Sequence, residues 1–174
     1  LWSDSDADVE PFTDGDRFAV GDREVEVWHL PGHTVGQCGF VLEDSDERAL
    51  FSGDALLPKY TPNVGGADVR DEDALQHYLD ALVRIVEGGF DVAYPGHRAP
   101  IDDPAGRARH ILDHHRERTG RVVDVLAAEG PADAWTVSAH LFGDLAGIHI
   151  LHGPGEAYAH LEHLRDSGLV SSAD

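Results

Sequence analysis

The chain has 174 residues, which is room for one medium domain or for a small domain and part of another. Its single cysteine, Cys38, excludes a disulfide framework. No apolar run is long enough to span a membrane, and no signal segment opens the sequence. These features favour a soluble, cytoplasmic protein.

The charge is strongly negative along the whole chain. There are 33 acidic residues against 13 basic ones, for a net charge of −20, and Lys59 is the only lysine. A local acidic tail would indicate an interaction segment, whereas here the acids are spread evenly. The composition resembles that of halophile proteins, because molar salt screens self-repulsion beyond about 3 Å. We therefore expect a protein adapted to a salt-rich cytoplasm.

The first part of the chain is predicted to contain two hairpins, a helix and a further strand. Residues 1–10 are acidic and linker-like. Alternating apolar and polar residues predict strands over 17–20 and 24–30, and a second hairpin follows over 39–43 and 49–52. After a loop rich in Pro and Gly, one apolar stripe predicts a helix over 71–87. A short buried strand is predicted over 90–94.

The second part of the chain is predicted to be helical. The pattern indicates a long helix over 104–129, interrupted near residue 120, and a shorter helix over 136–145. A third helix is predicted over 153–165, and a last strand begins at Leu169. Three helices followed by a strand in about sixty residues are typical of a helix-turn-helix or winged-helix module.

Three of the predicted strands end in glycine followed at once by a possible metal ligand. The ligands are His33 in Pro-Gly-His, Asp54 in Ser-Gly-Asp, and His97 in a second Pro-Gly-His. A glycine at the mouth of a strand lets the backbone turn sharply. Two imidazoles and one carboxylate delivered in this way are ligands that zinc prefers. The sequence therefore predicts a metal site.

Residues 12–115 resemble the metallo-β-lactamase superfamily, because these three motifs occur in the same order and each follows a predicted strand. The resemblance implies an α/β (α+β) fold, with this chain forming the second half of a four-layer αββα sandwich. It also implies that His33 completes one metal site, that His97 completes a second, and that Asp54 is the catalytic carboxylate bridging two zinc ions. Two such metals lower the pKa of water and polarise a carbonyl or phosphoryl oxygen.

The family's main signature, His-x-His-x-Asp-His, is absent from this sequence. Its nearest imitation, over 110–115, lies within a helical pattern and is interpreted as a polar helix face at a domain junction. The chain opens at Leu1 and contains no Met, so we expect a piece of a longer protein. With three ligands for two metals, we expect weak or absent metal binding and no hydrolysis by this chain alone.

Half a sandwich leaves the apolar face of its sheet uncovered. We expect that face to meet a partner, either the missing N-terminal half or a second copy of the chain. In the loop after Asp54, Lys59 and Tyr60 resemble the substrate contacts of glyoxalase II-like members, which implies a small-molecule substrate. The predicted boundary separates a domain over 1–114 from one over 115–174.

Residues 115–174 resemble the winged-helix-like domain appended to a subset of the superfamily. That subset includes an endoribonuclease of single-stranded RNA as well as ester and thioester hydrolases. The candidate recognition helix carries more acidic than basic residues, so nucleic acid is an unlikely partner. His160, His163 and Glu156 form a further possible metal set, although packing on the catalytic domain explains them as well.

The leading functional hypothesis is a zinc-dependent hydrolase of an ester or thioester, such as a hydroxyacyl-thiol conjugate. The alternatives are an endoribonuclease of the same superfamily and, from a different class, a metal-free regulatory or dimerisation module. An upstream His-x-His-x-Asp-His would exclude the metal-free module.

Overall fold

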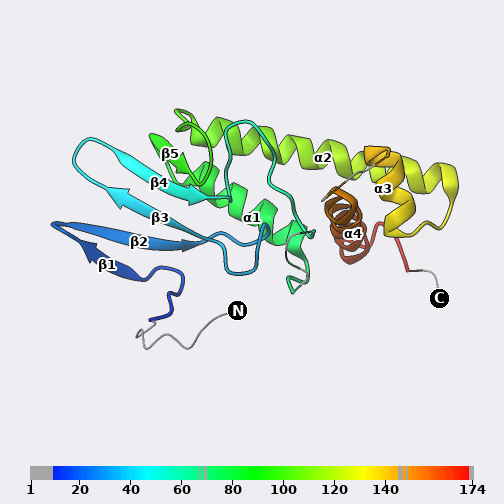
Figure 1. The fold of residues 1–174 in the computed structure, drawn as a ribbon, viewed down its shortest axis with the longest axis horizontal. Helices are drawn as coiled ribbons and strands as arrows, with labels where there is room; N and C mark the ends of the chain where they lie inside the picture. The colour runs from blue at the N-terminus through cyan, green and yellow to red at the C-terminus, as the bar shows by residue number, and fades with distance from the viewer. Residues whose placement is uncertain (1–9, 67, 69, 145–146, 148, 173–174) are drawn as a thin grey trace.

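The computed structural model describes residues 10–172 apart from 67, 69, 145–146 and 148. The prediction for residues 1–9 lies outside the described residues. The helix predicted over 136–145 instead spans Ala134–Phe142, because Gly143 ends it with a φ of +68°. Figure 1 shows the sheet at one end of the molecule, a cluster of helices at the other end, and a long helix that runs between them.

The sheet has five strands in the order β1-β2-β3-β4-β5. The antiparallel neighbours are β1 (Arg17–Val20), β2 (Arg23–His29), β3 (Cys38–Glu43) and β4 (Arg48–Gly53). Both predicted hairpins are thereby confirmed. β5 (Val92–Pro95) pairs with β4 in parallel, after the crossover helix α1 (Ala74–Glu87). Because these two strands are parallel, their C-terminal ends meet at one edge of the sheet.

The core of this part lies between the sheet and α1. Leu50 and Ala93 from the sheet and Leu30, directly after β2, form one buried cluster with Tyr78 and Leu82 from α1. The buried positions of α1 recur every three or four residues, which confirms an amphipathic helix with Leu75 and Leu82 on its buried face. Val83, which belongs to the predicted stripe, is 42% exposed instead. The sheet is therefore anchored on one face by a helix whose position is set by close packing.

The opposite face of the sheet is apolar, and it is open on the side of β4 and β5, whereas the Phe12 and Phe18 rings pack on Phe40 at the other side. Phe40, Phe51 and Tyr94 are direct cross-strand neighbours and so share one face, whereas Leu50 and Ala93 point into the core. Phe51 is 43% exposed and stacks on Tyr94 with ring centres 5.1 Å apart. This is the face that the sequence predicts to be uncovered.

The long helix α2 (Pro104–Glu129) joins two hydrophobic cores. Asp103 caps its N-terminus, and Pro104 opens it at a position where no backbone N–H is needed. The interruption predicted near residue 120 is wrong, because one glycine costs a helix only about 1 kcal/mol. Ile111 lies in the core beneath the sheet and Val122 in a second core with the C-terminal helices.

The second core is formed by the end of α2 with α3 (Ala134–Phe142) and α4 (His149–Asp166). The third helix was predicted to start at 153, but α4 begins at His149 and contains Pro154. A proline removes one backbone hydrogen bond, and here it does not end the helix. None of the helices in the described part of the chain has the length and apolarity needed to cross a membrane.

The strand predicted to begin at Leu169 is wrong. Gly168 has a φ of +72°, and its N–H donates to the Arg165 carbonyl at 2.9 Å. The Leu169 N–H donates to the Leu164 carbonyl, also at 2.9 Å, and this pair of bonds is a Schellman cap of α4. Up to residue 172 the chain after α4 forms no strand, so the helical unit carries no wing there.

Candidate metal centre

His33, Asp54 and His97 lie together at one edge of the sheet. Asp54 follows β4 and His97 follows β5, and the Gly96 N–H donates to the Gly53 carbonyl at 2.8 Å, which joins the two strand ends. His33 reaches the same edge because β2 runs in the direction of β4, with antiparallel β3 between them. We call these three residues the edge group.

Within the edge group, each imidazole faces a different oxygen of Asp54. The Nε2 atom of His33 is 3.8 Å from Oδ2, and the Nε2 atom of His97 is 3.6 Å from Oδ1. Both distances are too long for a hydrogen bond. The Oδ1 atom is buried and has no hydrogen-bond partner in the described part of the chain. Buried polar atoms are almost always paired, so this oxygen requires an explanation.

The edge group fits divalent cations. Two atoms that bind one tetrahedral zinc at about 2.0–2.2 Å lie about 3.4 Å apart. The two imidazole–carboxylate distances are close to that value. A cation beside each oxygen would leave Asp54 bridging two ions. Each ion would then receive one nitrogen and one oxygen from these residues, fewer than the three or four protein ligands that zinc sites use.

The glycines before the ligands serve two different purposes. Gly32 has a φ of +115°, and a Cβ there would lie 2.3 Å from the Tyr78 Cβ on α1. Gly53 has a φ of +52°, at an irregularity in the pairing of β4 with β5. These two confirm the sharp turns expected from the sequence. At Gly96 the reason is space, because a Cβ would lie 2.8 Å from Oδ1 of Asp54.

Lys59 and Tyr60 line a cavity beside His97. The cavity has a volume of about 480 Å³, and Leu57, Pro58 and Arg98 complete its lining. The Lys59 ammonium and the Arg98 guanidinium each lie 5.5 Å from the centre of the Tyr60 ring. Two cations around one ring in a chain of net charge −20 favour an anionic ligand group. Arg98 was missed from the sequence, where it is merely the residue after a ligand.

The cavity loop is attached to α2. The Arg107 side chain donates to the Leu57 carbonyl at 2.6 Å and to the Tyr60 carbonyl at 3.0 Å. These bonds fix the backbone that presents Lys59 and Tyr60 beside the edge group. The sequence offers no signal for them, because the bonded residues are about fifty positions apart.

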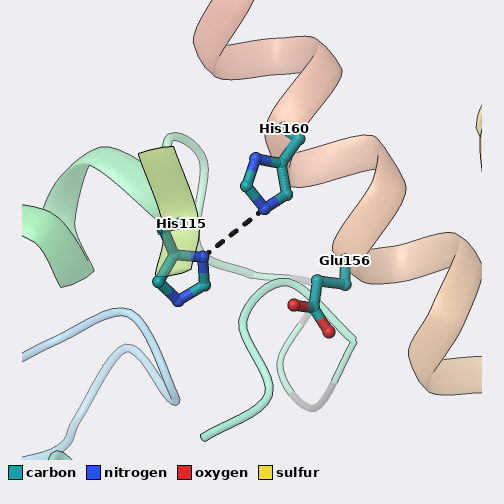
Figure 2. A group of neighbouring side chains, drawn as sticks. All are labelled: His115, Glu156 and His160. Atoms are coloured by element: carbon teal, nitrogen blue, oxygen red, sulfur yellow. Dashed lines mark hydrogen bonds between the residues drawn. The ribbon is translucent and has the colours of Figure 1, made fainter. Parts of the chain in front are cut away.

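A second group of histidine and carboxylate side chains lies where α2 meets α4. Figure 2 shows His115, Glu156 and His160, which we call the junction group. The Nδ1 atom of His115 and the Nε2 atom of His160 are 3.4 Å apart. The other ring nitrogen of His160 is 2.9 Å from the Thr119 hydroxyl. The spacing in the sequence groups His160 with His163, but in the structure His160 pairs with His115.

The junction group is buried, and burial changes the protonation of its members. Burial lowers the pKa of His115 to about 2 and that of His160 to about 3, so both imidazoles are neutral at ordinary pH. Burial also raises the pKa of Glu156, and the Arg118 guanidinium opposes this increase.

The ligand atoms of the junction group lie within 4.8 Å of one another, so a cation could be placed among them. However, Arg118 forms an ion pair with Glu156, and the Asn63 amide donates to the same carboxylate at 3.2 Å. A cation would have to share that carboxylate with a buried guanidinium of like charge. We therefore interpret the junction group as a hydrogen-bonded contact between helices.

Comparisons with known proteins place the chain in one family. The model of the metallo-beta-lactamase superfamily matches residues 3–97. A lactamase-like protein of Aspergillus fumigatus is 32% identical over 71% of this chain and 34% of its own length. One of Emericella nidulans is 31% identical over 70% of this chain and 36% of its own length. The chain thus spans about a third of the length of the curated relatives it matches.

Solved structures match the helical part of the chain as well. A metallo-beta-lactamase family protein from Thermus thermophilus is 34% identical, with a TM-score of 0.81 over 97% of this chain and 52% of that one. A beta-lactamase domain protein from Burkholderia ambifaria is 27% identical, with a TM-score of 0.77 over 92% of this chain and 48% of that one. The family model, which matches more than half of the chain, and the similar fold of a 34% identical protein show that this chain belongs to the metallo-beta-lactamase superfamily.

Proposed function

We propose that this chain is part of a hydrolase that uses two divalent metal ions, in which His33 binds one ion, His97 the other, and Asp54 bridges them. The observation that carries the proposal is the unpartnered Oδ1 atom of Asp54, with one imidazole facing each carboxylate oxygen. The remaining ligands would come from outside this chain. Zinc is the metal that this mixture of nitrogen and oxygen ligands suits best.

The substrate we propose is an ester or a thioester with an anionic end, such as a hydroxyacyl-thiol conjugate. Metal ions at the edge group supply the Lewis acidity that polarises the acyl carbonyl and lowers the pKa of water. Hydrolysis places the hydroxyl of water on the acyl carbon and a proton on the leaving thiol or alcohol. Lys59 and Arg98 lie in the adjacent cavity, where they would bind the anionic end.

The partner we propose is a polypeptide that covers the open sheet face. Phe40, Phe51 and Tyr94 form an apolar row on this face, and Phe51 is 43% exposed. An apolar face of this kind is usually buried in an interface. The missing half of the sandwich would cover it and also bring further metal ligands, and a second copy of this chain is the alternative. The chain alone should bind zinc weakly and hydrolyse nothing.

The test uses the full-length protein that contains this chain, assayed in molar salt against thioesters and single-stranded RNA. Replacing His97 with Ala should reduce thioester hydrolysis by more than the roughly 10- to 100-fold cost of losing a group that only supports a metal ligand. His110, an exposed histidine on α2, provides the matched control His110→Ala, which should leave the rate unchanged. Lys59→Ala should raise KM with little change in kcat.

Two results would reject this function. Cleavage of RNA with no thioester hydrolysis would favour the ribonuclease alternative. A wild-type rate of thioester hydrolysis after His97→Ala would remove the assignment of His97 as a metal ligand.

A further inference from the structure

The second ring nitrogen of His33 is held by a backbone carbonyl. Its Nδ1 atom lies 2.8 Å from the carbonyl oxygen of Asn63, and the imidazole is largely buried. A carbonyl oxygen only accepts hydrogen bonds, so the proton of the neutral ring must be on Nδ1. The Nε2 atom that faces Asp54 is then left with a lone pair, as metal binding requires. The position of the Asn63 carbonyl therefore decides which nitrogen of His33 can bind a metal.

The Asn63 side chain is bound to helix α4. Its amide nitrogen donates to the Glu156 carboxylate at 3.2 Å and to the His152 carbonyl at 3.4 Å. Its amide oxygen accepts from the Gly66 N–H at 3.1 Å. Arg118 on α2 forms an ion pair with Glu156 and so holds the carboxylate that Asn63 contacts. The loop next to His33 is thus attached to a residue 93 positions later in the chain.

Glycines let this loop touch the backbone of α4. A Cβ added to Gly155 would lie 2.5 Å from the Gly66 Cα and 2.8 Å from the Gly65 carbonyl oxygen. A Cβ added to Gly66 would lie 2.9 Å from the His152 Cα. Both clashes are with backbone, which cannot rotate away as a side chain can. The loop and the helix therefore have one close-packed arrangement.

We propose that α4 positions the metal ligand His33, with Glu156 and Gly155 acting as positioning residues through the Asn63 carbonyl. The inference rests on the proposed function, because it assumes that His33 binds a metal through Nε2. It gives the C-terminal helices a part in the metal centre without any contact of their own with the metal. The His97 ring is 70% exposed and makes no hydrogen bond in the described part of the chain, so α4 should affect the two imidazoles differently.

The chain offers a matched pair of substitutions. Gly155 and Gly120 both lie inside helices, but a Cβ on Gly120 would meet nothing within 4 Å. Gly155→Ala should push the loop off α4, whereas Gly120→Ala should leave it in place. Asn63→Ala is a second variant that removes the side-chain attachment while keeping the Arg118–Glu156 ion pair.

The first readout is the tautomer of His33, measured by ¹H–¹⁵N NMR of the imidazole rings in the metal-free chain. Wild type and Gly120→Ala should show the proton on Nδ1 alone, and Gly155→Ala and Asn63→Ala should show both tautomers. Glu156→Gln keeps an oxygen that can accept from Asn63, so it should preserve the wild-type tautomer. If Glu156 had a purely structural role, Glu156→Gln and Asn63→Ala would show the same tautomers of His33.

The second readout is a Zn²⁺ titration of the same variants in the full-length protein that contains this chain, because the chain alone should bind zinc weakly. Binding is followed on the His33 and His97 signals. Gly155→Ala should weaken binding at His33 by about 10- to 100-fold, and His33→Ala should abolish it. If His33→Ala leaves the titration unchanged, the proposed metal assignment fails. If His33→Ala abolishes binding while folded Gly155→Ala and Asn63→Ala keep the wild-type tautomer and affinity, only the positioning role is overturned.

Discussion

The edge group and the junction group contain the same kinds of side chain, two imidazoles and one carboxylate, yet their surroundings are opposite. At the edge, the carboxylate has a buried oxygen without a partner, and one imidazole is 70% exposed. At the junction, both imidazoles are buried, and a guanidinium and an amide occupy the carboxylate.

The contrast lies in the carboxylates, because the buried Nε2 atom of His115 at the junction also lacks a hydrogen-bond partner in the described part of the chain. It teaches that the partners of the carboxylate, rather than the residue types, distinguish these two groups. A side chain kept for a metal must be left without other strong partners, which costs the apo protein stability. A buried structural carboxylate must have its partners, because an unpaired buried charge is very unfavourable. Substitutions in the two groups should therefore have opposite effects on folding.

The largest effect is expected at the Arg118–Glu156 ion pair, whose side chains are only 15% and 10% exposed. Arg118→Met leaves the Glu156 carboxylate buried without its cation. The free energy of unfolding should fall by about 3–5 kcal/mol, measured by urea denaturation. Salt screens buried pairs weakly, so the loss should persist in molar salt.

The edge group provides the contrast for that measurement. Asp54→Asn removes a charge that has no cation beside it, so the free energy of unfolding should stay the same or rise by up to about 1 kcal/mol. At the junction, the double variant Arg118→Met/Glu156→Leu should recover most of the stability that Arg118→Met loses. A loss of several kcal/mol from Asp54→Asn would mean that the edge group, too, is structural.

The second effect is a dependence of stability on pH that comes from the junction imidazoles. The pKa values of His115 and His160 are lowered to about 2 and about 3 in the folded chain, whereas an unfolded histidine titrates near about 6.5. The unfolded state therefore binds more protons below that pH. Their contribution to stability is complete above pH 6.5 and is lost as the pH falls. As the pH falls below 6.5, each of the two imidazoles should lower the free energy of unfolding by about 1.4 kcal/mol per pH unit.

The measurement compares His160→Gln with wild type by denaturation between pH 5 and 6.5. Glutamine can still bond to Thr119 and His115 but does not titrate. The slope of stability against pH should fall by about 1.4 kcal/mol per unit. Taking the difference between variant and wild type cancels the contributions of other titratable groups to the slope. The exposed control His110→Gln should keep the wild-type slope, and an unchanged slope in His160→Gln would show that the ring is not buried in solution.

The edge group could be predicted from the sequence, because each of its members carries its own local signal. A strand pattern, a glycine and a ligand stand next to one another at His33, Asp54 and His97. Parallel pairing of β4 with β5 then requires two of them to meet. The helix α1 could be predicted for the same reason, because the apolar residues of its buried face all lie within fourteen consecutive positions.

The junction group and the Asn63 contact could not be predicted in this way. His115 and His160 are 45 positions apart, and Asn63 and Glu156 are 93 apart, so neither pairing has a local pattern. The short spacing of His160 and His163 along α4 favours pairing these two residues. In the structure, however, His163 does not belong to the group of His115, Glu156 and His160. The expected last strand was wrong because Gly168 and Leu169 satisfy the carbonyls at the end of α4 instead.

The smallest effect is expected at Arg98, beside the edge group. Its φ of +79° is a left-handed conformation that side chains with a Cβ rarely adopt. Arg98→Gly and Arg98→Ala both remove the contact with the Tyr60 ring, but only glycine removes the backbone strain. The glycine variant should be more stable than the alanine variant by about 1 kcal/mol, measured by urea denaturation.

Glycine and alanine should show the reverse order in α2. There Gly120 lies within a regular helix and nothing would contact its Cβ, so Gly120→Ala should raise stability by about 1 kcal/mol. Opposite signs at Arg98 and Gly120 would show that strain is stored at the edge of the sheet and not in the helices that support it. If alanine were as stable as glycine at position 98, the two regions would differ only in the missing partners of the Asp54 carboxylate, and the edge would be preorganised without backbone strain.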